Sequence, residues 1–115
     1  VYRGKPYLIE CKTTRNLTAF PLYYGATRSV PKHQVSASKN IERNGGVGMI
    51  LIRREEPRNK RCFALLPSQA EYLYSEFGKK RKSVPWSWFE ENCTELDRLA
   101  KPVRWNLTKL FNDLI

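Results

Sequence analysis

Apolar and polar side chains alternate along residues 6–12, near the start of the chain. Such alternation is typical of a β-strand, in which successive side chains point to opposite sides. The alternating residues are Tyr7, Ile9 and Cys11 on one side and Leu8, Glu10 and Lys12 on the other. We expect the first side, with Cys11 inert in the core, to be buried. The second presents a carboxylate beside an ammonium group.

Thr, Asn, Gly, Pro and Ser recur across residues 13–31, which predicts a long connection rather than a helix or a strand. Apolar residues that would anchor this connection are Leu17, Phe20, Leu22 and Tyr23. Connections of this length are uncommon in compact domains unless they are functional. We therefore expect the segment to contribute to a site.

Residues 32–44 contain neither Gly nor Pro and predict a helix that ends at Gly45-Gly46. The apolar run 47–52 predicts a strand that is buried on both faces. A strand, a crossover helix and a strand favour parallel, right-handed pairing. Residues 62–66 predict a further strand, joined to 47–52 as a hairpin through residues 55–60. The pattern thus predicts an α/β domain with a mixed sheet.

The second half of the chain predicts three more helices. Ser68-Gln69-Ala70-Glu71 has the form of a capping box, so one helix should begin there and end at Gly78. The other two are residues 86–92, with Pro85 in the first turn, and residues 107–114, with Asn106 as the cap.

The composition favours a single domain with a polyanionic partner. The 115 residues suffice for one hydrophobic core. A net charge of +10 and a pI near 9.8 attract phosphate groups, which makes nucleic acid the first candidate. Neither a spanning apolar run nor a basic amphipathic helix points to a membrane. A soluble basic protein without a polyanionic partner is the alternative.

Cysteine and histidine usage narrows the chemistry. Cys11, Cys62 and Cys93 are far apart, odd in number and without CxxC spacing, so we expect no disulfide framework, no zinc site and a cytoplasmic location. His33 is the sole histidine, which leaves no hydrolytic His dyad; we expect it to shape the helix entry. Because Val1 lies within a strand-like pattern, we expect the single domain, residues 1–115, to lack an amino-terminal segment.

Glu10-Cys11-Lys12 is the triplet with the clearest chemical meaning. On a strand, Glu10 and Lys12 share a face. A carboxylate can hold Mg²⁺, which polarises a phosphate and activates a water, and a lysine can orient that water or stabilise the developing charge. The alternative interpretation is an exposed salt pair, which contributes little to stability.

Short motifs in a fixed order resemble the RecU-type Holliday junction resolvases of the PD-(D/E)XK nuclease superfamily. The motifs are Tyr2-Arg3-Gly4-Lys5, Ile9-Glu10-Cys11-Lys12-Thr13-Thr14, Ala19-Phe20-Pro21-Leu22, His33-Gln34, Gly45-Gly46-Val47-Gly48, Arg81-Lys82-Ser83-Val84-Pro85 and Glu90-Glu91-Asn92. Each match is short, but their order and spacing extend over nearly the whole chain.

This resemblance implies a restriction-endonuclease-like mixed β-sheet flanked by α-helices, in a homodimer that cuts four-way DNA junctions with Mg²⁺ or Mn²⁺. It implies that Glu10 and the Cys11 carbonyl are metal ligands, that Lys12 is the catalytic lysine, and that Gln34 is a polar support near the site. Gln34 could equally be a solvated residue in the first turn of a helix.

One departure concerns the metal site. The superfamily places an acidic residue on the strand before the Glu-x-Lys strand, and no Asp or Glu precedes Glu10 here. Because Mg²⁺ usually needs one or two carboxylates beside its waters, Glu10 alone would hold it poorly. We expect an upstream Asp to complete the site; otherwise the chain is catalytically impaired.

Basic residues could hold the DNA backbone. The densest run is Lys79-Lys80-Arg81-Lys82, which would contact phosphates without reading bases if it is more than a solvated loop. Arg15, Arg28 and Lys32 flank the candidate site in sequence. The basic residues around the hairpin, for which solubility is an equal explanation, are Arg53, Arg54, Arg58, Lys60 and Arg61. For Trp86, Trp88 and Trp105 we favour core or dimer packing over base stacking.

The sequence thus predicts a homodimeric, metal-dependent endonuclease for four-way junctions in the cytoplasm of a bacterial or phage-infected cell. Two alternatives stay open. One is a nuclease of the same superfamily with another DNA target, such as a restriction-like, homing or phage enzyme. The other is a non-catalytic DNA-binding module.

Overall fold

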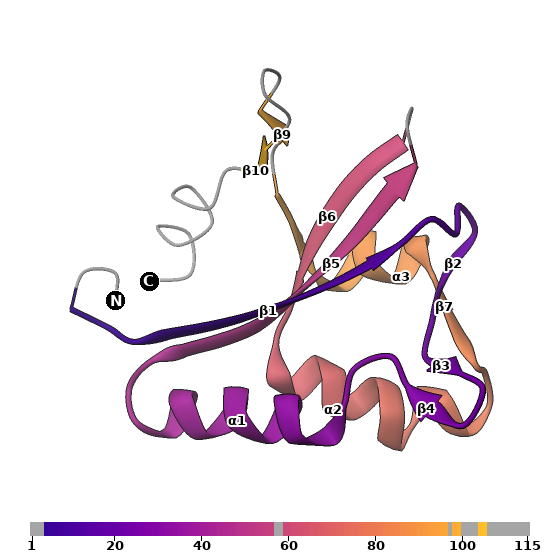
Figure 1. Cartoon of the computed structure of the whole chain (residues 1–115). Coiled ribbons are helices and arrows are strands. Elements are labelled where there is room, and N and C mark those ends of the chain that lie inside the picture. Colours follow the sequence, from indigo (N-terminus) through magenta and orange to yellow (C-terminus); the bar gives the residue numbers. More distant parts are fainter. Residues whose placement is uncertain (1–3, 57–58, 97, 100–103, 106–115) are drawn as a thin grey trace.

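The chain folds around one mixed β-sheet. The computed structural model describes residues 4–56, 59–96, 98–99 and 104–105 (Figure 1). Within these ranges the sheet has the order β1-β5-β6-β8, and its strands are β1 (Tyr7–Thr14), β5 (Val47–Glu56), β6 (Asn59–Leu65) and β8 (Thr94–Glu95). β1 is parallel to β5, and the other pairs are antiparallel. The predicted mixed sheet and the β5–β6 hairpin are confirmed.

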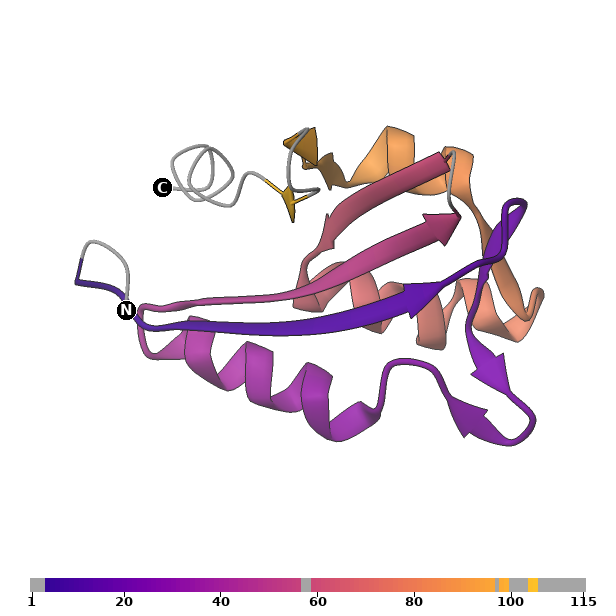
Figure 2. The ribbon, with the colours of Figure 1, turned by 45° about the horizontal axis from the view of Figure 1, so that its top comes forward.

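Helix α1 (Lys32–Arg43) connects β1 to β5 and packs against both strands. The predicted helix is confirmed, and it ends before Gly45, whose φ of 82° favours glycine. Val35 and Ser38 are its buried residues. A Cβ atom on Gly48 would lie 2.7 Å from the Cα of Ser38, so glycine allows β5 and α1 to approach closely. Figure 2 shows β1 and β5 running side by side, with α1 along them.

The two faces of the sheet contribute to different apolar clusters. The larger cluster joins Ile50, Ile52, Phe63 and Leu65 of the sheet to residues from the three described α-helices. The smaller cluster, on the opposite face, consists of Met49, Leu51, Cys62, Ala64 and Leu96, with Ile9 and Val47 packed against it. The described helices thus cover the first face.

The prediction that Cys11 is buried in the core is wrong, because Cys11 is exposed. It does share the face of Ile9, as the alternation predicted. However, β1 is the edge strand of the described sheet, and the smaller cluster packs against Ile9 without reaching Cys11. Strand alternation predicted the side of β1 on which Cys11 lies, but it could not predict whether other residues cover that side.

The long connection contains three short strands: β2 (Ala19–Pro21), β3 (Tyr23–Tyr24) and β4 (Thr27–Arg28). β2 pairs with β7 (Ser83–Pro85), a contact that the sequence pattern did not predict. Phe20 and Leu22 are buried anchors as expected, but Leu17 is 52% exposed and anchors nothing. Asn16 instead holds the start of the connection, since its Oδ1 accepts hydrogen bonds from the backbone N–H groups of Thr18 and Ala19.

The later helices are α2 (Pro67–Ser75) and α3 (Trp86–Asn92), with a 3₁₀ turn η1 (Phe77–Lys79) between them. The predicted capping box is wrong, because the helix is capped two residues earlier than Ser68. The cap residue is Leu66, whose backbone N–H donates to Oε1 of Gln69 at 2.9 Å. The helix ends at Ser75 rather than Gly78. The predicted helix 107–114 lies outside the described residues, which close with the strand pair β9 (Arg98–Leu99) and β10 (Arg104–Trp105).

Two of the three tryptophans pack as expected. Trp86 is buried, stacks on Phe63 with ring centroids 6.0 Å apart, and donates its Nε1–H to the carbonyl of Asn16. Trp88 packs edge-on against Phe89. The side chain of Trp105 is outside the described residues. None of the described helices has both the length and the apolar character needed to cross a membrane.

Candidate active site

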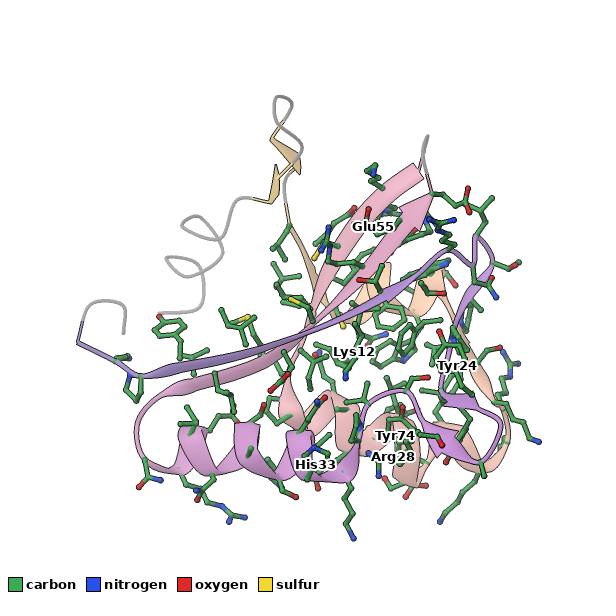
Figure 3. All side chains as sticks on the ribbon, viewed as in Figure 1. Lys12, Tyr24, Arg28, His33, Glu55 and Tyr74 are labelled. Atoms are coloured by element: carbon green, nitrogen blue, oxygen red, sulfur yellow. The ribbon has the colours of Figure 1, made fainter. Side chains whose placement is uncertain are left out.

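Glu10 and Lys12 lie on the face of β1 that is turned toward the helices. In the sheet register they are the partners of Ile50 and Ile52, which are fully buried in the larger cluster. Glu10 and Lys12 are themselves half-buried. Figure 3 shows Lys12 extending from β1 into the layer between the sheet and α1. A carboxylate and an ammonium group therefore project side by side at the rim of an apolar core.

Neither charge has an ion-pair partner within the described part of the chain. The ion pairs there are Lys39 with Glu71, Glu55 with Arg53 and Lys60, and Arg61 with Glu90 and Glu95. The salt-pair alternative for Glu10 and Lys12 is therefore not realised. Partial burial of a charge without a partner costs free energy, which favours a functional over a stabilising role for the two residues.

Gln34 occupies the first turn of α1, the helix that packs against β1. Its side chain is half-buried, and its Oε1 is a buried acceptor without a hydrogen bond in the structure. The Oε1 atom is therefore shielded from solvent, and the role of Gln34 near the site stays a prediction. His33 precedes it and is exposed, and Figure 3 places it in this turn.

Oxygen donors are available for a hard cation, but they are few. The described residues contain no group of three or more His, Cys, Asp or Glu side chains that would hold a metal ion. The Glu10 carboxylate and the Cys11 carbonyl have the oxygen chemistry that Mg²⁺ prefers. They fit part of an octahedral site, which waters, a substrate phosphate and a further carboxylate would fill.

The basic residues predicted to hold DNA are exposed or half-buried around the connection between β1 and α1. Arg15 is exposed directly after β1, Arg28 lies in β4, and Lys32 begins α1. The run 79–82 is exposed and reaches the same part of the molecule, because β7 pairs with β2 and the carbonyl of Lys82 accepts the N–H of Leu22 at 2.8 Å. Figure 1 shows these short strands together beside the start of α1.

The basic residues of the hairpin have other partners. Arg53 and Lys60 pair with Glu55, and Arg54 is buried, with its guanidinium 5.4 Å from the ring centroid of Trp86. Arg61 donates to both carboxylate oxygens of Glu95 at 2.8 and 2.6 Å. Its hydrogen bonds to Glu95 raise the pKa of Arg61. These contacts favour a structural role over DNA binding at the hairpin.

A groove between α1 and α2, with a volume of about 410 Å³, contains further basic residues that the sequence reasoning missed. Lys39 and Arg43 line it together with Arg28 and Lys32. The signal was available: Lys32, Lys39 and Arg43 follow each other at i, i+7 and i+11, which brings them to one face of a helix.

Comparison with known proteins assigns the family. The family model described as "Recombination protein U" (RecU) matches residues 1–111. The chain belongs to the RecU family. The resemblance found in the motifs is thereby confirmed, and the mixed sheet with its helices is compatible with the restriction-endonuclease-like fold that this resemblance implied.

Individual RecU relatives agree over most of the chain. A Holliday junction resolvase RecU of Shouchella clausii is 38% identical over 109 residues, which cover 93% of this chain and 44% of the relative. The resolvase RecU of Pediococcus pentosaceus is 31% identical over 103 residues, which cover 90% of this chain and 48% of the relative. That of Ureaplasma parvum is 28% identical over 113 residues, which cover 98% of this chain and 60% of the relative. The chain spans about half the length of the curated relatives it matches.

Proposed function

We propose that the protein is a metal-dependent endonuclease that cuts four-way (Holliday) DNA junctions during recombination and repair. The observation that carries this proposal is that Glu10 and Lys12, side by side on β1 in a chain of the RecU family, have no ion-pair partner among the described residues. The relatives named Holliday junction resolvase RecU support the choice of substrate. The net charge of +10 suits any DNA substrate.

In this proposal the Glu10 carboxylate and the Cys11 carbonyl would hold Mg²⁺ or Mn²⁺, together with a carboxylate from outside the described residues. The bound ion would polarise the scissile phosphate and acidify a water. Lys12 orients the attacking water through its ammonium group and stabilises the negative charge that develops on the phosphate. The buried Oε1 of Gln34 can accept a hydrogen bond from that water. Direct attack by water leaves a 5′-phosphate and a 3′-hydroxyl.

DNA is held in this proposal by basic side chains around the site. These are Arg15, Arg28, Lys32, Lys79, Lys80, Arg81 and Lys82. Contacts with phosphates give affinity without base reading, which suits an enzyme that selects a DNA shape. A four-way junction has two strands to cut, so we expect a homodimer, and sedimentation of the full-length protein would measure its mass.

A panel of substrates tests the activity. The full-length protein with Mg²⁺ should cut four-way junctions faster than linear, nicked or flapped duplexes of the same sequence. Equal rates on linear duplex would assign a nuclease with another DNA target. Tight binding without cleavage of any substrate, with Mg²⁺ or Mn²⁺, would assign a non-catalytic DNA-binding module.

A further inference from the structure

The groove between α1 and α2 is open and basic. We call it the α1–α2 groove and define it by Arg28, Lys32, Lys39 and Arg43, opposite Glu71 and Tyr74. Its four cations and single carboxylate leave a net charge of +3 (4 − 1) around a volume of about 410 Å³. An excess of this size in a concave surface concentrates positive potential and favours an anionic occupant.

The cations differ in how they are held. Arg28 is fixed: its Nε–H donates to the carbonyl of Val30 at 3.0 Å, and its guanidinium lies 3.8 Å from the ring centroid of Tyr74 (Figure 3). Lys39 pairs with Glu71 across the groove, although both side chains remain more than a third exposed. Lys32 and Arg43 have no ion pair with any residue that the structure describes. Two cations are thus available and a third is loosely held.

The spacing along α1 suits a phosphate chain. With a rise of about 1.5 Å per residue, Lys32 to Arg43 span about 16 Å along one face of the helix. Successive phosphates of one DNA strand lie about 3.4 Å apart along the duplex axis, so a duplex lying along α1 offers phosphates to each cation. A single small anion would leave most of this row unused.

The groove and the candidate active site both border the first turn of α1. Lys32 lines the groove and is exposed, whereas Gln34, two residues later, turns its Oε1 into the buried side. Two residues correspond to about 200° of rotation around the helix, so Lys32 and Gln34 point to nearly opposite sides of α1. An arm that leaves the candidate site would therefore pass the start of α1 before it enters the groove.

From these observations we infer that the α1–α2 groove binds the phosphate backbone of a DNA arm that extends away from the cutting site. The inference rests on the proposed function only in taking DNA as the substrate. Lys39 exchanges Glu71 for a phosphate when DNA binds. The groove holds the arm without reading its sequence, because the lining offers charges rather than groups aimed at base edges.

A matched pair of double variants tests this inference. Lys39→Gln/Arg43→Gln and Lys5→Gln/Lys60→Gln each lower the net charge of the full-length protein by two. DNA binding is measured with Ca²⁺ over a range of salt concentrations, on junctions with long arms of about 20 base pairs or short arms of about 6. With long arms the groove variant should bind at least about tenfold more weakly, and its salt slope should fall by about 1.8, since each lost phosphate contact removes about 0.9.

With short arms, which offer fewer phosphates to the row along α1, the groove variant should lose less affinity than with long arms. Glu71→Gln should bind long arms more tightly, because it releases Lys39; a merely structural ion pair would not give this gain. Equal losses in both double variants, or equal losses on both arm lengths, would overturn the inference. Because DNA binding is measured without cleavage, failure to cut junctions would refute the proposed function but would not affect the test of the groove.

Discussion

Gln34 places a buried carbonyl oxygen where no described donor reaches it. A buried acceptor without a partner costs about 1–3 kcal/mol, so such a residue is a poor choice for stability alone. Its position in the first turn of α1, which packs against the strand of Glu10 and Lys12, is the basis for the role that we propose for this oxygen. At the scale of single residues, a polar group at the rim of the core can lower stability and still serve a function.

Replacing Gln34 with Met, an apolar side chain of similar size, should therefore leave the free energy of unfolding unchanged or raise it by about 1 kcal/mol. The rate of junction cleavage should fall by about 10- to 100-fold. Denaturant unfolding and single-turnover cleavage measure the two effects. Gln69→Met is the matched control, because Gln69 bonds Leu66 and Asn92; it should lower stability and spare cleavage. An unchanged cleavage rate in Gln34→Met would show that Gln34 has no role in cleavage.

The three thiols should differ in reactivity. Burial raises the pKa of Cys62 and of Cys93 to about 12, so both are protonated at pH 8, whereas Cys11 is exposed. A maleimide at pH 8 should label Cys11 in the folded protein and the other two only after unfolding. Mass spectrometry of labelled peptides against time measures this order. Equal labelling rates would contradict the burial of Cys62 and the partial burial of Cys93.

The same shifts predict a pH dependence of stability. A thiol with a raised pKa in the folded state stabilises the protein fully below its unfolded pKa, near 9, and loses this contribution as the pH rises toward 12. Within that window each thiol should lower the free energy of unfolding by about 1.4 kcal/mol per pH unit. Comparison with Cys62→Ala isolates one thiol: the variant should show a shallower decline, and an unchanged slope would refute the shift.

At the scale of elements, α1 contributes to both the candidate active site and the α1–α2 groove. Its buried side packs on β5 through Val35 and Ser38, its first turn holds Gln34, and its exposed row forms one wall of the α1–α2 groove. The close approach at Gly48 fixes the depth at which the helix rests on the sheet. A change there moves a whole element rather than one side chain.

Gly48→Ala should therefore lower the free energy of unfolding by about 1–3 kcal/mol, because the new methyl group meets the backbone of Ser38, which cannot rotate away. Cleavage should fall as well, since Gln34 moves with α1. Thermal unfolding and cleavage by the same preparation check both. Ser36→Ala, an exposed change on the same helix, is the control and should leave both near their starting values. Full stability in Gly48→Ala would contradict the packing.

Long elements were predictable from the sequence, and short ones were not. Residues 32–44 follow helix periodicity because one side of the helix is buried, and residues 47–52 form an apolar run because β5 is buried on both faces. The β2–β7 pair escaped prediction, since three-residue strands are defined by a partner over 60 positions away. Glu10 and Lys12 were identifiable because alternation fixes a strand face. The exposure of Cys11 depended on which elements cover that face, and no local pattern contains that information.

At the scale of the whole molecule, charge is divided between two regions. Acidic partners neutralise the basic residues of the hairpin, as Glu55 does for Arg53 and Lys60. The basic residues around the connection from β1 to α1 have few such partners among the described residues, apart from Lys39. Among the described residues, the positive charge without ion-pair partners therefore lies mainly around that connection, where DNA would meet Glu10 and Lys12. Substitutions can therefore change the affinity for DNA and the rate of cleavage separately.

Substitution of Glu10 tests the central claim most directly. In the full-length protein with saturating Mg²⁺, Glu10→Gln should reduce single-turnover cleavage of a four-way junction by at least about 1000-fold, which corresponds to about 4 kcal/mol of transition-state stabilisation. Junction affinity, measured by fluorescence anisotropy, should change by less than about threefold. Glu42→Gln, an exposed change in α1, should alter neither value. Cleavage by Glu10→Gln within about tenfold of the unmodified protein would contradict the account.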